Sequence, residues 1–119
     1  MSQSASSASV TIKAVCRAAA QLGLSVGDLA GVIGVSEPLA ARMWRAERVP
    51  PLSSKSHELA LLFIRLHNAL DCVACGDASV SRAWISNEHA VLHARPIDAI
   101  QSVSGLLTVV SYVEAFQHR

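Results

Sequence analysis

The sequence predicts an all-α protein, with an N-terminal helix-turn-helix bundle followed by a small helical domain. Apolar residues recur at helical spacing in nearly every segment, and no stretch alternates apolar and polar residues over the length of a strand. The 119 residues contain only six glycines. Apolar residues make up 51% of the chain and charged residues 16%, a composition too hydrophobic for a disordered protein.

The chain begins with a segment that lacks a helical pattern. Residues 1–9 are mostly serine and alanine without apolar periodicity, so we expect a disordered tail there. Beyond this tail, Val15, Ala19 and Leu22 recur at helical spacing until Gly23. The first helix is therefore expected to end at this glycine, because glycine readily adopts the left-handed conformation found after helices.

Capping residues delimit the next two helices. Ser25, with Asp28 three residues later, has the pattern of a capping box at the start of a helix. Gly34 ends that helix, and Ser36 is placed to cap the following one. We assign these three helices, residues 10–52, to a first domain.

The spacing within residues 24–44 is typical of a helix-turn-helix. Ala30 is small enough to let the two helices approach, Gly34 supplies the turn, and the apolar Val35 fills the corner between them. In DNA-binding proteins the second helix of this motif meets base edges in the major groove. The residues expected on this surface are Ser36, Glu37, Ala41, Arg42 and Arg45, with Arg48 and Lys55 near the phosphates. A helical hairpin that only packs into a core fits the same spacing.

The charge of the chain limits how it could bind nucleic acid. Its net charge is +1, whereas a protein that binds nucleic acid by charge alone would be far more basic. Residues 1–53 hold five basic and three acidic side chains (+2), and residues 54–119 hold five basic and six acidic ones (−1). Any contact with DNA is therefore expected in the first half.

Helices are also expected in residues 53–119, which we assign to a second domain. The strongest covers residues 56–75, where apolar side chains follow the i, i+3, i+4 rule. The shorter elements expected after it are a helix around Trp84, a helical turn over residues 88–92, a helix from Pro96 and a last helix capped by Ser104.

Residues 82–116 resemble the C-terminal toxin-binding domain of the MbcA/ParS/Xre antitoxins. The matching positions are Trp84, Asn87, Leu92, Pro96, Ile97, Ile100, Gly105 and the helix from Val109 to Phe116. Because these antitoxins carry an Xre-type helix-turn-helix ahead of that domain, the resemblance extends over about residues 18–119. The chain departs from the family pattern by lacking a glycine between Asn87 and Pro96 and another near Ala115.

The resemblance implies an antitoxin of a type II toxin–antitoxin system. Such a protein would cover the active site of a cognate RES-type toxin, which consumes NAD or transfers ADP-ribose, and would regulate its own operon by binding operator DNA. It would act as a homodimer within a hetero-oligomeric complex. The residues expected to bind the toxin are Asn87, Arg95, Tyr112, Phe116, Gln117, His118 and Arg119.

The residues themselves leave alternatives open. Aromatic side chains on a terminal helix with few charges suit a protein interface, but Tyr112 and Phe116 also suit the core of the chain's own fold. A stand-alone helix-turn-helix repressor without a toxin partner, or a helical adaptor, is compatible with the same pattern. The chain contains no glycine-rich phosphate loop and no nucleophile elbow, so we do not expect an enzyme.

The cysteines raise the question of a metal. Cys72 and Cys75, followed after 13 residues by His89 and His93, match the spacing of a two-cysteine, two-histidine zinc site. Both cysteines end a long helical pattern instead of lying in a turn between strands, so we expect no metal and no other cofactor. With Cys16 they make three, an odd number that favours reduced thiols.

The sequence also bears on the cellular compartment. The longest apolar run is Leu59–Ile64, far below the roughly 20 residues that a membrane helix needs. Residues 1–10 lack the basic start and apolar run of a secretory signal. We therefore expect a cytoplasmic protein without a membrane partner.

Overall fold

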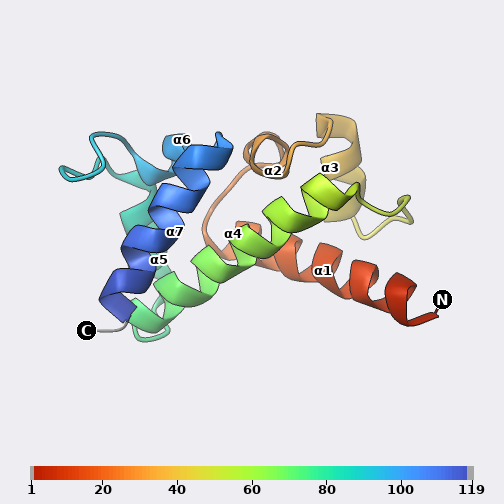
Figure 1. The fold of residues 1–119 in the computed structure, drawn as a ribbon, viewed down its shortest axis with the longest axis horizontal. Helices are drawn as coiled ribbons and strands as arrows, with labels where there is room; N and C mark the ends of the chain where they lie inside the picture. The colour runs from red at the N-terminus through yellow and green to blue at the C-terminus, as the bar shows by residue number, and fades with distance from the viewer. Residues whose placement is uncertain (1, 118–119) are drawn as a thin grey trace.

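The computed structural model describes residues 2–117, and this range consists of helices joined by turns and loops, with one isolated bridge. No strand is present among the described residues, which confirms the predicted all-α fold. The molecule measures 42 × 25 × 25 Å along its principal axes (Figure 1). The helices are α1 (Ser2–Gln21), α2 (Val26–Ile33), α3 (Glu37–Trp44), α4 (Ser54–Val73), α5 (Ala78–Ser86), α6 (Pro96–Ala99) and α7 (Val103–Gln117).

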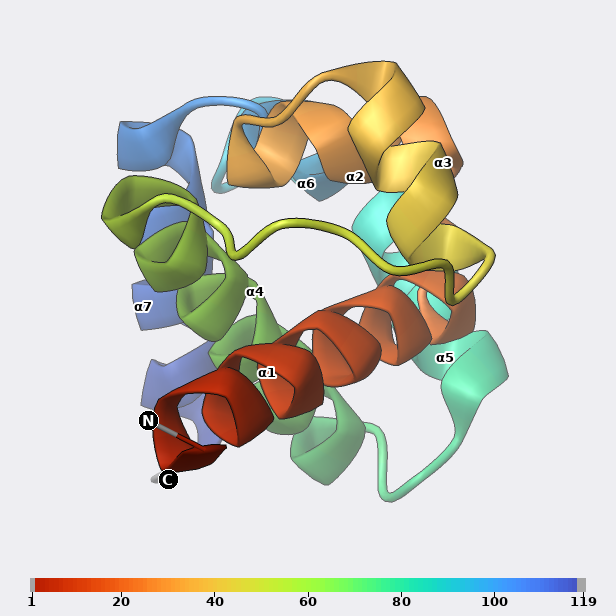
Figure 2. The ribbon, with the colours of Figure 1, turned by 90° about the vertical axis from the view of Figure 1, so that its right-hand side faces the viewer.

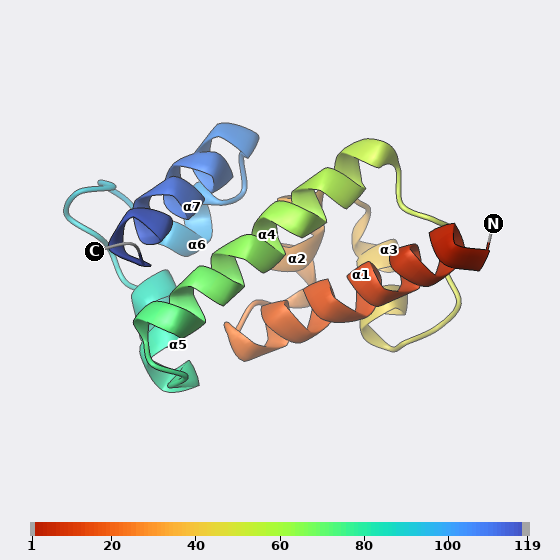
Figure 3. The same ribbon diagram turned by 60° about the horizontal axis from the view of Figure 1, so that its bottom comes forward.

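Helix α4 lies at the centre of the fold. It packs against α7 on one side and against α1 and α2 on the other, as Figures 1 and 3 show from two directions. Phe63 and Leu66 of α4 are fully buried in one hydrophobic cluster that also contains Val15 of α1, Ile33 of α2 and Val109 of α7. The two halves assigned from the sequence therefore share a single core, because α4 contributes to both.

Helix α1 is longer than the sequence analysis expects. It begins at Ser2 and so covers residues 2–9, where we expected a disordered tail. The segment contains no glycine or proline, and its alanines favour the helical conformation, so the helix continues backwards through it. Met1, His118 and Arg119 lie outside the described residues.

The predicted caps of α2 and α3 are confirmed. The Ser25 hydroxyl accepts a hydrogen bond from the Asp28 backbone N–H, and the Asp28 carboxylate accepts one from the Ser25 N–H, both at 3.0 Å. The Ser36 hydroxyl accepts the Leu39 N–H at 3.2 Å. Gly34 has φ of 71°, the left-handed conformation that the turn requires. Local polar contacts thus fix the start of each helix.

The connection between α5 and α6 contains the predicted helical turn, displaced by one residue. The His93 N–H donates to the His89 carbonyl (2.9 Å), four residues earlier, which is the bond of a single helical turn over residues 89–93. His93 ends this turn at φ of 57°. The His89 N–H donates to the Ala94 carbonyl (3.0 Å) across an isolated antiparallel bridge that encloses the turn.

The start of α7 also differs from the prediction. Ser102, not Ser104, provides the cap, because its hydroxyl accepts the Gly105 N–H at 3.0 Å. Gly105 is required at this point, since a Cβ atom there would lie 1.9 Å from the Ala99 carbonyl oxygen. Glycine at this position thus permits the close approach of α7 to α6.

Among residues 2–117, no single helix combines the length and the apolar character needed to cross a membrane. Helices α4 and α5 satisfy these criteria only when taken together, and they are bent by 119° at the break between them.

Candidate functional site

Helices α2 and α3 form a helix-turn-helix with one buried and one exposed side. Ala30 of α2 and Ala40 and Met43 of α3 are buried where the helices pack, and Val35 between them is half-buried against the core. Ser36, Glu37 and Arg42 are exposed, while Ala41 is half-buried. The structure thus places the N-terminal residues of α3 on the surface, as recognition by this motif requires.

The residues that follow α3 fold back against its last turn. Arg45 is the C-terminal cap of α3, and the next residue, Ala46, has a φ of 59°. The Glu47 N–H then donates to the Arg42 carbonyl at 3.0 Å, and the Ala46 N–H donates to that of Met43 at 3.0 Å. This pair of bonds is the Schellman arrangement, here with alanine at the position that glycine usually occupies.

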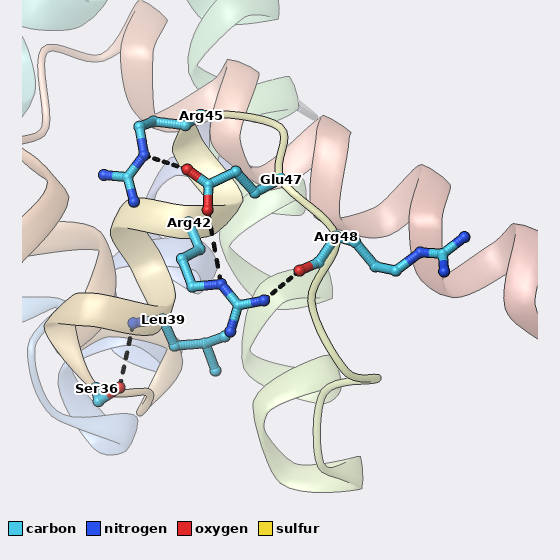
Figure 4. A network of polar contacts seen from close by, with 6 residues as sticks. All are labelled: Ser36, Leu39, Arg42, Arg45, Glu47 and Arg48. Carbon is cyan, nitrogen blue, oxygen red and sulfur yellow. Dashed lines mark hydrogen bonds and ion pairs between the residues drawn. The ribbon is translucent and has the colours of Figure 1, made fainter.

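The Schellman turn holds the Glu47 carboxylate between two arginines (Figure 4). Arg45 donates its Nε–H to one carboxylate oxygen at 2.5 Å, and the Arg42 Nε lies 3.8 Å from the other. The hydrogen bond from Arg45 lowers the pKa of Glu47 below its ordinary value, and the charges of both arginines contribute to this shift. Arg42 also donates a hydrogen bond to the Arg48 carbonyl. We call Arg42, Arg45, Glu47 and Arg48 the arginine cluster.

The arginine cluster remains accessible to a ligand. The side chains of Arg42 and Arg45 are 46% and 58% exposed, and exposed ion pairs contribute little stability because water screens them. A phosphate or a base edge can therefore compete with Glu47 for either guanidinium. The Arg48 side chain points away from Glu47, and only its backbone carbonyl takes part in the contacts drawn in Figure 4.

The structure places Lys13 beside the residues predicted to bind DNA, whereas Lys55 lines a different groove. Lys13 of α1 and Arg48 line the same hollow between α1 and the turn after α3. Sequence spacing gave no sign of this, because the two residues belong to different elements. Lys55 instead lies on the first turn of α4, where it lines a groove between α4 and α7.

A second group of candidate residues is an aromatic cluster in the C-terminal half. Tyr112 of α7 has its ring 5.0 Å from that of His89, 5.0 Å from that of Phe116 and 6.4 Å from that of Trp84 on α5. The Tyr112 hydroxyl lies 3.5 Å from His89 Nε2. The other ring nitrogen of His89, Nδ1, is buried without a hydrogen-bond partner in the described part of the chain. We call Trp84, His89, Tyr112 and Phe116 the aromatic cluster.

A small apolar hollow of about 60 Å³ opens beside the aromatic cluster, between the end of α4, α5 and α7. Val73, Val80 and Phe116 line it and are also 46%, 50% and 42% exposed, respectively. Large aliphatic and aromatic groups around a hollow are typical of the centre of a protein interface. We call these three residues the C-terminal face.

The expected toxin-binding residues are only partly brought together. Tyr112 and Phe116 meet in the aromatic cluster, and Gln117 is exposed at the end of α7. Asn87 is exposed after α5 and donates its backbone N–H to the Ala83 carbonyl. Arg95 is engaged elsewhere, since two of its guanidinium nitrogens bind the Asp98 carboxylate at 2.9 and 3.1 Å. His118 and Arg119 lie outside the described residues.

The sequence analysis missed several residues of this region. Val73 and Val80 of the C-terminal face were not singled out, and His89 was considered only as a metal ligand. These residues meet Phe116 and Tyr112 across a long sequence separation, so no local pattern marks them. Trp84 was indicated as a site residue only by the family resemblance.

The zinc-like spacing does not become a site in the described part of the chain. Cys72 and Cys75 are exposed at the end of α4, whereas the His89 ring packs in the aromatic cluster. No group of three or more histidine, cysteine, aspartate or glutamate side chains within residues 2–117 is placed to hold a metal ion. The third thiol, Cys16, is half-buried, and this burial raises its pKa.

Fold and site together define an all-helical protein with a helix-turn-helix and a separate exposed apolar face. No protein-family model matches the chain, and comparison with curated proteins gives no match.

Proposed function

We propose that the chain is an antitoxin of a type II toxin–antitoxin system that also regulates transcription. In this proposal the helix-turn-helix binds operator DNA, and the C-terminal face covers the active site of a cognate RES-type toxin. The observation that carries the proposal is that one core presents two separate surfaces of different chemistry. The end of α3 presents arginines, whereas the end of α7 presents apolar groups around a hollow.

Operator binding is supported by the geometry of the arginine cluster. Glu47 holds the guanidinium groups of Arg42 and Arg45 side by side at the surface. Arginine is the side chain that most often reads a guanine edge, through two hydrogen bonds in the major groove. We infer that Arg45 exchanges Glu47 for a base edge, while Arg48 and Lys13 contact phosphates.

DNA binding can be tested by a salt titration on duplexes from upstream of the chain's own gene and on scrambled duplexes. Arg45→Ala should weaken binding to the operator by about 1–3 kcal/mol and relax specificity at one base pair. Arg48→Ala should weaken binding to every duplex alike and lower the salt slope by about one unit. Arg82→Ala, which removes an exposed arginine from α5 together with its hydrogen bond to the Gln21 carbonyl (3.3 Å), is the control, and its circular dichroism is compared with that of the wild type. Equal affinity of the wild-type protein for both duplexes would contradict a specific operator.

Toxin binding is supported by the chemistry of the C-terminal face. The nearby Glu114 carboxylate is paired with Arg65 at 2.7 Å, so it does not oppose an apolar partner with a free charge. A few desolvated side chains near the centre of a protein interface, often aromatic, contribute most of its binding energy. We infer that the rim of the hollow, Val80 and Phe116, anchors the toxin, and that the bulk of the antitoxin excludes the toxin's substrate.

Co-expression with the RES-type product of a neighbouring gene tests this assignment. Phe116→Asp and Val80→Asp should each abolish protection of the cells, because a carboxylate would be buried against the toxin. Val10→Asp, at a residue 65% exposed on α1, should protect as well as the wild type. Circular dichroism of each variant separates loss of binding from loss of fold. Full protection by the folded Phe116→Asp and Val80→Asp variants would overturn the toxin-binding assignment.

A stand-alone repressor is the second candidate function. It is favoured by the aromatic cluster, in which Tyr112 and Phe116 pack against each other and thus already contribute to the fold. Such a repressor would retain the DNA results described above, but it would neither bind nor neutralise the product of a neighbouring gene. The co-expression experiment therefore separates the two candidates.

A further inference from the structure

A hollow of about 420 Å³ opens between α1 and the connection that follows α3. Ile12 of α1, Met43 of α3 and Val49 of the connection form its apolar wall, together with Ala8 and Pro51. Met43 belongs to the buried core, and Ile12 and Val49 pack against that core, so the wall is part of the folded structure. The hollow has the volume of a small-molecule site, which is typically about 300–1,000 Å³. We call it the α1–α3 hollow.

Two cations without an acidic partner line the α1–α3 hollow. Lys13 comes from α1 and Arg48 from the connection, and neither forms an ion pair within residues 2–117. The Arg48 side chain extends away from the other members of the arginine cluster (Figure 4). Glu47 also lines the hollow, but its carboxylate is held by Arg42 and Arg45. The hollow therefore carries an excess of positive charge, which attracts an anion.

The apolar wall and the two cations together define the chemistry of an occupant. A carboxylate or phosphate group between an arginine and a lysine gains charge-assisted hydrogen bonds from both. An apolar body attached to that group would displace water from the wall, which is favourable by the hydrophobic effect. The phosphate backbone of DNA supplies the charge without the apolar body, and a neutral apolar group leaves both cations unused. An occupant that joins both groups in one small molecule is complementary to the whole hollow.

We propose that the α1–α3 hollow binds a small organic anion, in which one carboxylate or phosphate group is joined to a compact apolar body. The anionic group lies between Lys13 and Arg48, and the apolar body packs on Ile12 and Val49. Because we assign the same two cations to DNA phosphates, the bound anion competes with DNA, and this consequence alone rests on the proposed function. Binding of the anion is tested without DNA or toxin, so its failure is distinguishable from that of the proposed function.

The ligand class is tested by calorimetric titration of the wild-type protein with phenylbutyrate. The matched probes are phenylbutanol, which keeps the apolar body without the charge, and acetate, which keeps the charge without the body. Each should bind at least about tenfold more weakly than phenylbutyrate, because each uses only half of the hollow. Phenylbutyl phosphate compares the two anionic groups, and the tighter of the two anions identifies the preferred one. Absence of saturable binding by both anions, or equal affinity for phenylbutanol, would overturn the proposal.

The location of the site is tested with variants of exposed residues. Lys13→Gln and Arg48→Gln should each weaken phenylbutyrate binding by about five- to tenfold and leave phenylbutanol binding unchanged. Of the two cations within α1, Lys13 lines the hollow and Arg17 does not, so Arg17→Gln is the matched control and should bind as the wild type does.

Filling the hollow provides a second test of its location. Ser9 is exposed and lines the hollow, so Ser9→Trp should abolish binding although both cations remain. Circular dichroism establishes that each variant is folded. Unchanged binding by folded Ser9→Trp, or equal losses in Arg17→Gln and Lys13→Gln, would overturn the assignment of this hollow.

Discussion

The helix-turn-helix and the aromatic cluster are held in place by contacts of different range. In the helix-turn-helix, the Ser25–Asp28 capping box and the Ser36 cap join residues three positions apart. In the aromatic cluster, Tyr112 meets His89 and Trp84 across 23 and 28 positions of the chain. Local contacts can form early and singly, whereas distant contacts exist only when the whole core has assembled.

Both regions nevertheless depend on α4. Helix α2 packs on one part of it, and α5 and α7 pack on another (Figure 2 shows α4 behind α1, with α2 and α3 to one side). The side chains of Trp44 on α3 and Trp84 on α5 both pack against the shared core. The two regions therefore differ in the range of the contacts that determine their structures. They nevertheless share one core, so they are stabilised together.

The largest effect is predicted for Phe63, the largest fully buried side chain among the described residues, which lies in the middle of α4. Phe63→Ala should lower the free energy of unfolding by about 3–5 kcal/mol, because it removes buried apolar volume and leaves a cavity. Single-tryptophan variants, Trp84→Phe and Trp44→Phe, report each region separately in denaturant titrations. Phe63→Ala should lower the midpoint of the denaturant transition by the same amount in both single-tryptophan backgrounds.

One outcome would separate the regions. If Phe63→Ala shifted the Trp84 transition and left the Trp44 transition in place, the helix-turn-helix would be an independent folding unit. Phe63→Leu keeps most of the volume and should give a smaller shift in both transitions, which serves as a control for variants that are too unstable to measure.

The range of the contacts also explains which features could be predicted from the sequence. The all-α class and the caps at Ser25 and Ser36 follow from patterns within a few residues, and the structure confirms them. The turn predicted over residues 88–92 lies one residue later, at 89–93, where the pairing of His89 with Ala94 encloses it. The hollow at Val73 and Val80 could not be foreseen, since it depends on how α4, α5 and α7 meet.

An intermediate effect is predicted for the cap of α7, where sequence and structure disagree. Ser102→Ala should lower the free energy of unfolding by about 1 kcal/mol, because the Gly105 N–H loses its acceptor. Ser104→Ala, two positions away and also exposed, should change it by less than about 0.5 kcal/mol. Ser36→Ala, at the equivalent cap of α3, should match Ser102→Ala. Thermal unfolding of the three variants gives the ranking, and a larger loss for Ser104→Ala would restore the cap expected from the sequence.

The smallest effect is predicted at Ala46, and it has the opposite sign. A left-handed conformation costs a residue with a Cβ atom about 1–2 kcal/mol, whereas glycine loses about 0.5–1 kcal/mol more chain entropy on folding. Ala46→Gly should therefore raise the free energy of unfolding by about 0.5–1 kcal/mol. Cys75, at φ of 54° after α4, ends its helix with the same pair of hydrogen bonds, so Cys75→Gly should stabilise the other region similarly. Ala41→Gly, within α3, should instead destabilise by about 1 kcal/mol. Urea titrations measure all three, and a loss of stability in Ala46→Gly would show that the turn holding the arginine cluster is not strained.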